Sequence, residues 1–187
     1  KTGRNTSAKF DLGRNVCNKL WNAARFAMAL LGERHEGTEE RHEGTKERRH
    51  EGTDVVEGCP ENAVTSCLRA FVPACPPDRV PAYLPDRWML SRLAAGIEAI
   101  DGHLARFEFS EYAQACYDLL WRDFCDWYLE AIKPTVQSSA EQRQVLALAI
   151  DTVLRLLHPL APFVTEAIWE HLHPGGAGLL CVATWPQ

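Results

Sequence analysis

The sequence lacks the long apolar run that would mark a membrane span or a secretory signal. No uncharged apolar stretch approaches the roughly 20 residues that a membrane-crossing helix needs, and the opening residues 1–5 contain no apolar signal core. We therefore expect a cytoplasmic protein without a membrane partner. The 187 residues, of which 46% are hydrophobic and 24% charged, fit one globular domain over residues 1–187.

The sequence also lacks a metal-binding signature. The seven cysteines are an odd number, and no Cys-x-x-Cys pair occurs among them. A metal clip from the evenly spaced Cys59, Cys67 and Cys75 is the weaker alternative.

Four acids on one predicted helix could instead resemble a di-metal site, but no Glu-x-x-His unit accompanies them. Ion pairing with Arg122 on a solvated helix face is the favoured interpretation of Asp118, Asp123, Asp126 and Glu130.

Catalytic signatures are missing as well. There is no phosphate loop, no dinucleotide glycine fingerprint and no nucleophile elbow in the chain. We therefore predict that this segment contains no catalytic residue and holds no cofactor or metal of its own.

A repeated polar tract interrupts the chain. Arg-His-Glu-Gly-Thr begins at Arg34, Arg41 and Arg49, and the repeats carry no apolar residue that could offset the entropy of ordering them. We predict a disordered insertion at 33–60 and an irregular, proline-containing linker at 61–84. The repeat histidines could bind a metal, but a solvated tract is favoured.

Outside that tract, apolar residues recur at three- and four-residue spacing, which predicts helices. The apolar run at 145–157 should form the central helix, with Ser139 and Gln142 as its capping box. We therefore predict an all-α fold, an antiparallel helix bundle, and 179–183 could add a short C-terminal strand. The expected helices are Arg14–Leu31, Pro85–Arg106, a helix capped by Ser110 that reaches Lys133, Ser139–His158, and one that ends near Leu172.

Positive charge is concentrated at the N-terminal end. Residues 1–26 hold six Lys or Arg residues and one Asp, although the whole chain carries a net charge of −5. Local positive charge, rather than a basic average, is what phosphate contacts require. The first predicted helix combines cations with amides that can read base edges, and a polar helix surface is the alternative. The candidate RNA-binding residues are Arg14, Asn15, Asn18, Lys19, Asn22 and Arg25.

Several motifs occur together in a fixed order. They are residues 13–26 (GRNVCNKLWNAARF), 84–93 (LPDRWMLSRL), 123–130 (DFCDWYLE) followed by Lys133-Pro134, and 157–169 (LHPLAPFVTEAIW). In this combination the chain resembles the anticodon-binding domain of valyl-tRNA synthetases over residues 4–31 and 84–187. The first and third motifs are the ones similar to the valine enzymes in particular. Residues 33–83 depart from the family pattern.

The resemblance implies a function in tRNA recognition. It implies that the bundle binds the anticodon stem-loop of valine tRNA isoacceptors, while a catalytic domain elsewhere in the parent chain uses ATP and magnesium to esterify valine to tRNA. It also implies that Arg14, Lys19 and Arg25 contact phosphates or base edges. The same resemblance implies that Asn15, Asn18 and Asn22 read bases through their amides. A stand-alone bundle that binds another protein is the rival hypothesis.

Overall fold

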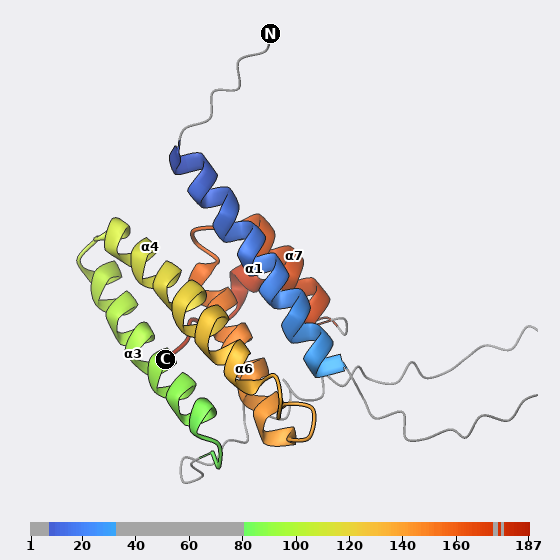
Figure 1. The fold of residues 1–187 in the computed structure, drawn as a ribbon. Coiled ribbons are helices and arrows are strands. Elements are labelled where there is room, and N and C mark those ends of the chain that lie inside the picture. The colour runs from blue at the N-terminus through green and yellow to red at the C-terminus, as the bar shows by residue number, and fades with distance from the viewer. Residues whose placement is uncertain (1–7, 33–80, 174–175, 177) are drawn as a thin grey trace, which may run out of the picture.

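The computed structural model describes residues 8–32, 81–173, 176 and 178–187, and these residues form an antiparallel bundle of helices (Figure 1). No strand occurs in the described ranges, so the predicted all-α class is confirmed. The predicted insertion at 33–60 and nearly all of the predicted linker at 61–84 lie outside the described residues. The main helices are α1 (Ala8–Gly32), α3 (Leu84–Ala105), α4 (Phe109–Asp118), α6 (Ala140–Leu157) and α7 (Pro162–Leu172).

Helix α6 forms the centre of the core, as its apolar run predicts. Twelve of its 18 residues are buried, and it packs against α1, α3 and α7. The Ser139 hydroxyl accepts a hydrogen bond at 3.2 Å from the Gln142 backbone N–H, which satisfies one of the free donors of the first turn. Burying apolar surface on all sides of α6 is the main stabilising contribution to this bundle.

One long predicted helix contains an irregular middle. Helix α4 continues without a break into the π-helix η1 (Leu119–Tyr128) and then α5 (Leu129–Ile132). The predicted cap at Ser110 is wrong, because the helix already begins at Phe109. In a π-helix the hydrogen bonds span five residues rather than four, and such segments often occur at functional sites. The wider turn changes which side chains of this segment face each neighbour.

The predicted C-terminal strand is wrong. Residues 180–182 form a single 3₁₀ turn, η2 (Leu180–Val182). The Leu180 N–H donates a hydrogen bond at 2.8 Å to the Glu166 carboxylate, and the Leu180 side chain is buried in the core. The tail is thus fixed by α7, and no strand lies beside it in the described ranges.

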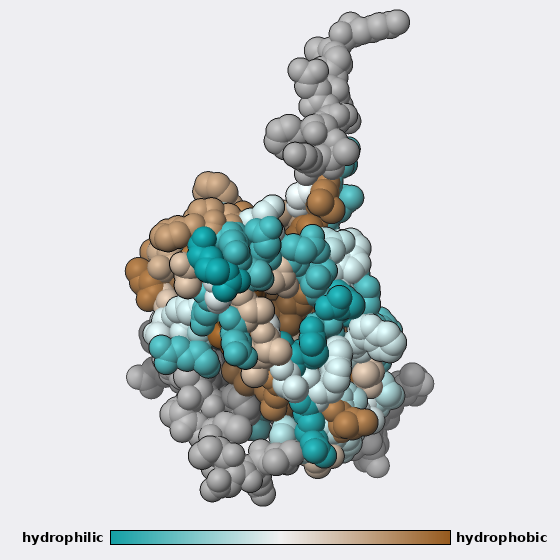
Figure 2. All heavy atoms as spheres, turned by 90° about the vertical axis from the view of Figure 1, so that its left-hand side faces the viewer, coloured by the Kyte–Doolittle hydropathy of each residue, from teal (hydrophilic) through white to brown (hydrophobic). Residues whose placement is uncertain are grey.

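Large apolar side chains are exposed at two turns of the bundle. Phe107 and Phe109 at the α3–α4 turn are 78% and 60% exposed, and Phe163 at the start of α7 is 91% exposed. Figure 2 shows the side of the bundle on which α3 lies. Polar surface covers most of that side, and apolar surface gathers toward its upper left.

Candidate nucleic-acid interface

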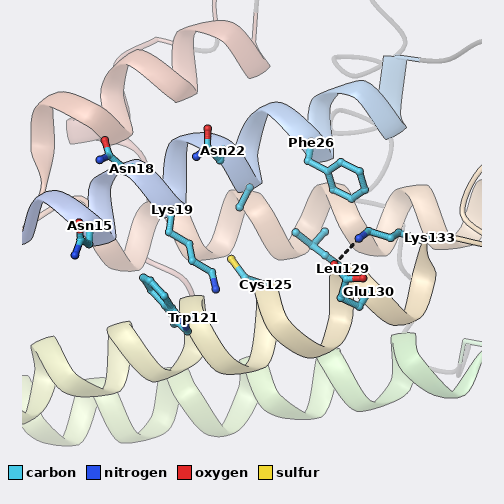
Figure 3. A pocket seen from close by; sticks show the side chains of 11 residues that line it. Asn15, Asn18, Lys19, Asn22, Phe26, Trp121, Cys125, Leu129, Glu130 and Lys133 are labelled. Carbon is cyan, nitrogen blue, oxygen red and sulfur yellow. Dashed lines mark hydrogen bonds and ion pairs between the residues drawn. The ribbon is translucent and has the colours of Figure 1, made fainter. Parts of the chain in front are cut away.

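An open groove lies where α1 runs beside η1 and α5 (Figure 3). Its volume is about 470 Å³. Amide, ammonium and aromatic groups surround a small apolar floor, so that polar and stacking contacts are offered together. The lining residues are Asn15, Asn18, Lys19, Asn22, Ala23 and Phe26 from α1, and Trp121, Cys125, Leu129, Glu130 and Lys133 from the facing segment.

Four of the six candidate residues predicted from sequence line this groove: Asn15, Asn18, Lys19 and Asn22. Arg14 and Arg25 do not line it. Both arginines are exposed, and the Arg14 guanidinium is 2.8 Å from the Asp11 carboxylate. Residues 14 and 25 are about three helical turns apart and therefore share a strip of α1 beside the groove.

Lys19 is already engaged in the groove wall. Its Nζ atom lies 2.6 Å from Asp126 Oδ1 and 3.9 Å from the centroid of the Trp121 ring. The Lys19 side chain is only 25% exposed. The ion pair and the cation–π contact together connect α1 to η1. In the unbound protein Lys19 is therefore a structural link as well as a candidate RNA contact.

The two aromatic side chains of the groove, Phe26 and Trp121, and its second lysine, Lys133, are not among the candidate residues predicted from sequence. Phe26 lies seven residues after Lys19, so helical spacing alone could have placed it on the same face. Trp121 and Lys133 come from a distant segment, and no local pattern indicates their proximity to α1. The Lys133 Nζ pairs with Glu130 and lies 5.3 Å from the Phe26 ring centroid. Trp21, near the predicted face, packs edge-on against His171 instead.

The groove is suited to binding rather than to covalent chemistry. Its one thiol, Cys125, is buried, and burial raises the pKa of Cys125 to about 12. A thiol with that pKa stays protonated at neutral pH and is a poor nucleophile. The aromatic rings can stack on a planar group, and the amides can both donate and accept hydrogen bonds at its edge.

The acids of η1 differ from the prediction of a solvated, intrahelical set. Asp123 is 3% exposed, and its carboxylate pairs with Arg92 of α3 at 2.8 Å and with Arg122 at 2.9 Å. Asp126 pairs with Lys19 of α1. Asp123 therefore links η1 to α3, and Asp126, which stays half exposed, links η1 to α1.

Within the described ranges, no group of three or more His, Cys, Asp or Glu side chains is placed to hold a metal ion. Cys59, Cys67, Cys75 and the repeat histidines lie outside the described residues. Among the helices of the described ranges, none has the length and apolar character to cross a membrane.

Comparison with known proteins gives a consistent result. The family model for the anticodon-binding domain of tRNA ligase matches residues 86–187. Valine–tRNA ligase from Xylella fastidiosa (strain M12) is 35% identical over 176 residues, which cover 89% of this chain and 15% of that protein. Valine–tRNA ligase from Bacillus cereus (strain ATCC 10987 / NRS 248) is 32% identical over 177 residues, which cover 92% of this chain and 16% of that protein. The chain thus spans about 15% of the length of the curated relatives it matches, and the resemblance predicted from the motifs is confirmed.

Proposed function

This chain belongs to the anticodon-binding domain family of tRNA ligases, and from that premise we propose that its α1–η1 groove binds the anticodon loop of valine tRNA. The observation that carries the proposal is the composition of the groove. Three asparagine side chains, two lysines and two aromatic rings from segments far apart in sequence meet around one open hollow. Unpaired bases of RNA loops are recognised by this combination of edge hydrogen bonds and aromatic stacking.

Each part of the groove has a distinct role in the proposal. Phe26, whose ring reaches into the groove in Figure 3, stacks on an unpaired base. Asn18 and Asn22 form hydrogen bonds with base edges, because an amide can both donate and accept. Lys133 lies beside Phe26 and exchanges its exposed Glu130 partner for a phosphate. Lys19 keeps Trp121 in place until RNA competes with Asp126 for its ammonium group.

The arginines beside the groove extend the contact surface. Arg14 and Arg25 are exposed on the adjoining strip of α1, where a phosphate backbone leaving the groove passes over them. Arginine suits phosphate because its planar group can form two parallel hydrogen bonds. These two residues therefore position the RNA, whereas the groove residues read it.

The ligase reaction itself belongs to the longer protein in this proposal. The relatives are named valine–tRNA ligases and are several times longer than this chain. We assign ATP-dependent esterification of valine to tRNA, with ATP and magnesium, to a catalytic domain in their additional length. The anticodon contact supplements an amino-acid pocket that discriminates poorly between isosteres. Charging of tRNA during protein synthesis would take place in the cytoplasm.

Binding of a valine anticodon stem-loop to the 187-residue chain tests the proposal. The Asn22→Ala plus Lys133→Glu variant should bind about tenfold or more weakly, since a good base-edge contact alone contributes about 1–3 kcal/mol. Arg106→Glu is the control, because Arg106 is exposed at the α3–α4 turn and lines no part of the groove. Fluorescence anisotropy of a labelled stem-loop measures the affinity. Equal affinity of the folded double variant and the control would show that RNA binds elsewhere.

A second candidate function is binding of a protein partner. The exposed rings of Phe107 and Phe109, 6.4 Å apart between centroids, favour it, because neighbouring exposed apolar side chains mark contact sites. Phe163 is a separate exposed ring at the start of α7. The two functions use different surfaces. This candidate would be favoured if the wild-type chain bound no tRNA in anisotropy measurements and if Phe163→Ala abolished binding to a protein partner.

A further inference from the structure

A second cluster of cations lies on the other side of η1, where this π-helix packs against α3. Arg92 from α3 and Arg122 from η1 both donate through Nε to the buried carboxylate of Asp123, at 2.8 Å and 2.9 Å. Gly96 allows α3 to approach closely here, since a Cβ atom at that position would lie 3.2 Å from the Leu119 side chain. One buried carboxylate thus holds two guanidinium groups side by side.

The terminal Nη atoms of both arginines make no hydrogen bond to Asp123, which binds their Nε atoms. Among the described residues, these Nη atoms make one ion pair, between Arg122 Nη1 and Asp118 Oδ2 at 4.0 Å. The two side chains are 39% and 54% exposed. Together they line a hollow of about 320 Å³ between α3 and η1. The arginine groups therefore border open space while their Nε atoms are fixed.

The unengaged guanidinium nitrogens of the cluster favour an anion. Two guanidinium groups share the single carboxylate of Asp123. Asp118 also lines the hollow and brings the formal charge of the four groups to zero. Its one ion pair with the cluster is long, 4.0 Å to Arg122, and its carboxylate is hydrogen-bonded to Gln114 at 3.0 Å, so the preference for an anion rests on the guanidinium donors that Asp118 does not engage. A planar guanidinium whose orientation is fixed in advance loses little entropy when it binds phosphate through two hydrogen bonds.

Aromatic rings lie at the next turn of the same α3–η1 contact. The Tyr128 hydroxyl donates to Asp86 at 2.9 Å, so the N-terminal part of α3 lies opposite the C-terminal part of η1. Trp88 and Trp127 flank this pair in sequence, and both reach solvent, with Trp127 65% exposed. Exposed aromatic rings beside cations are typical of surfaces that bind single-stranded nucleic acid.

We propose that Arg92 and Arg122 form a phosphodiester-binding site for the same tRNA and that Trp127 stacks on a neighbouring unpaired base. This inference rests on the proposed function of the groove. η1 contributes to both surfaces: Trp121 and Cys125 line the groove, whereas Arg122 and Asp123 line the hollow. An RNA strand that leaves the groove can therefore cross η1 and place its next phosphates against the arginine pair.

The salt dependence of binding tests the phosphate contact. Arg122→Gln should lower the affinity for a valine tRNA transcript about tenfold, the loss expected for a hydrogen bond to a charged group. The slope of log affinity against log salt concentration should fall in magnitude by about 0.7–0.9 for each phosphate contact that is removed. Arg106→Gln is the matched control, because Arg106 is 57% exposed and also paired with a carboxylate. Trp127→Ala should weaken binding, and Phe107→Ala, which removes a ring that is more exposed still, should not.

Ethylation of single tRNA phosphates locates the contact. In the wild-type chain one ethylated phosphate should weaken binding, and this interference should disappear in Arg122→Gln. Arg92→Gln should give the same loss as Arg122→Gln. A urea unfolding curve checks that each variant is folded, and Arg92→Lys, which keeps the charge but cannot form two parallel hydrogen bonds with a phosphate, takes its place if Arg92→Gln unfolds. An unchanged slope together with the same interference pattern in folded Arg122→Gln would overturn the proposal.

Three further outcomes separate this inference from its alternatives. NMR signals of the Arg92 and Arg122 Nε–H groups that shift with inorganic phosphate but not with tRNA would identify a free-anion site and overturn the RNA contact. If Asn22→Ala plus Lys133→Glu weakened tRNA binding and Arg122→Gln did not, this inference would be overturned and the proposed function of the groove would stand. Failure of the wild-type chain to bind any valine tRNA would overturn the proposed function and with it this inference.

Discussion

The hydroxyl of Tyr128 lies 2.9 Å from Oδ1 of Asp86, and this hydrogen bond joins η1 to the first turn of α3. Both side chains are fully buried. The other oxygen of Asp86, Oδ2, is buried without a hydrogen-bond partner among the described residues. Burial therefore raises the pKa of Asp86 above its ordinary value of 3.8, although the hydrogen bond from Tyr128 acts in the opposite direction.

Tyr128→Phe should lower the free energy of unfolding by about 1–3 kcal/mol at pH 7, because it leaves a buried carboxylate without its donor. The loss should be smaller below pH 3.8, where Asp86 is protonated in both the folded and unfolded states. The raised pKa of Asp86 means that its contribution to stability is fully present below its unfolded pKa and is lost as pH rises through its folded pKa. The hydrogen bond from Tyr128 lowers the folded pKa, so the variant, which lacks that bond, has a still higher folded pKa and loses more stability than the wild-type chain as pH rises. Urea unfolding at the two pH values measures this difference. Tyr117→Phe is the control, since the Tyr117 hydroxyl makes no hydrogen bond in the described ranges; an equal loss in both variants would contradict the prediction.

His173 should make the fold sensitive to mild acid. Its ring lies against the Trp169 ring, 3.9 Å away between centroids and tilted by 36°, and its Nε2 atom lies 3.8 Å from Asp151 Oδ1. Burial lowers the pKa of His173 below 6.5, against opposing contributions from the Trp169 carbonyl and Asp151. The folded state then binds fewer protons than the unfolded state, so the stability present above pH 6.5 falls as pH drops through that value toward the folded pKa.

The His173→Gln variant isolates this effect. Its free energy of unfolding should change less between pH 7.5 and pH 5.5 than that of the wild-type chain, as measured by urea unfolding. His171→Gln is the control, because His171 is exposed on the same helix. Parallel pH profiles for wild type and His173→Gln would refute the prediction.

Phe107→Gly should stabilise the bundle. Phe107 has a φ of 59°, the left-handed conformation that a residue with a Cβ atom adopts at a cost. The ring is largely exposed, so its removal sacrifices little burial beyond the contact with Phe109. We expect the free energy of unfolding to rise by up to about 1 kcal/mol, because relief of the left-handed conformation, about 1–2 kcal/mol, exceeds the extra entropy that glycine loses on folding, about 0.5–1 kcal/mol. Thermal unfolding monitored by circular dichroism measures the change, with Phe109→Gly, in a helix, as a control that should destabilise.

Asp126→Asn should strengthen tRNA binding. The variant removes the ion pair that engages Lys19 and takes one negative charge away from the groove wall. We expect an affinity increase of about two- to fivefold at 100 mM salt, consistent with the modest energy of a half-exposed ion pair. Anisotropy with the labelled stem-loop provides the measurement. Glu111→Gln serves as the charge-matched control, because Glu111 is exposed in the first turn of α4 and lines neither the groove nor the hollow. A loss of affinity in Asp126→Asn would show that the pair is needed to hold the groove open.

The fold could be predicted because each main helix has local sequence signals for its position and its ends. Apolar spacing, the Ser139 cap and the prolines located α3, α6 and α7 within a few residues. The π-helical turns of η1 could not be found in this way, because both helix types are compatible with the same apolar pattern. The strand expected at 179–183 is absent for a related reason: a short apolar run is equally compatible with a turn fixed by Glu166.

The candidate site was predictable on one helix and hidden on the other. The amides of α1 follow from spacing within a single motif, and three of them line the groove. Trp121 and Lys133 could not be assigned to the site from the sequence. Their proximity to α1 results from packing between segments that lie about a hundred residues apart. The sequence predicts a solvated Asp123 that pairs within its own helix. In the fold, the Asp123 carboxylate is buried and is shared by Arg122 and by Arg92 of α3.

Gly32 at the end of α1 and Leu84 at the start of α3 lie at the same end of the bundle (Figure 1). The packed helices fix the positions of these two ends of the connecting chain. Closing such a connection becomes more costly only with the logarithm of its length, by about 0.6 kcal/mol for each doubling. The fold can therefore tolerate large changes in length at this one junction. Evolution can lengthen the chain here, and an experimenter can insert a reporter here, with little effect on either RNA-facing surface.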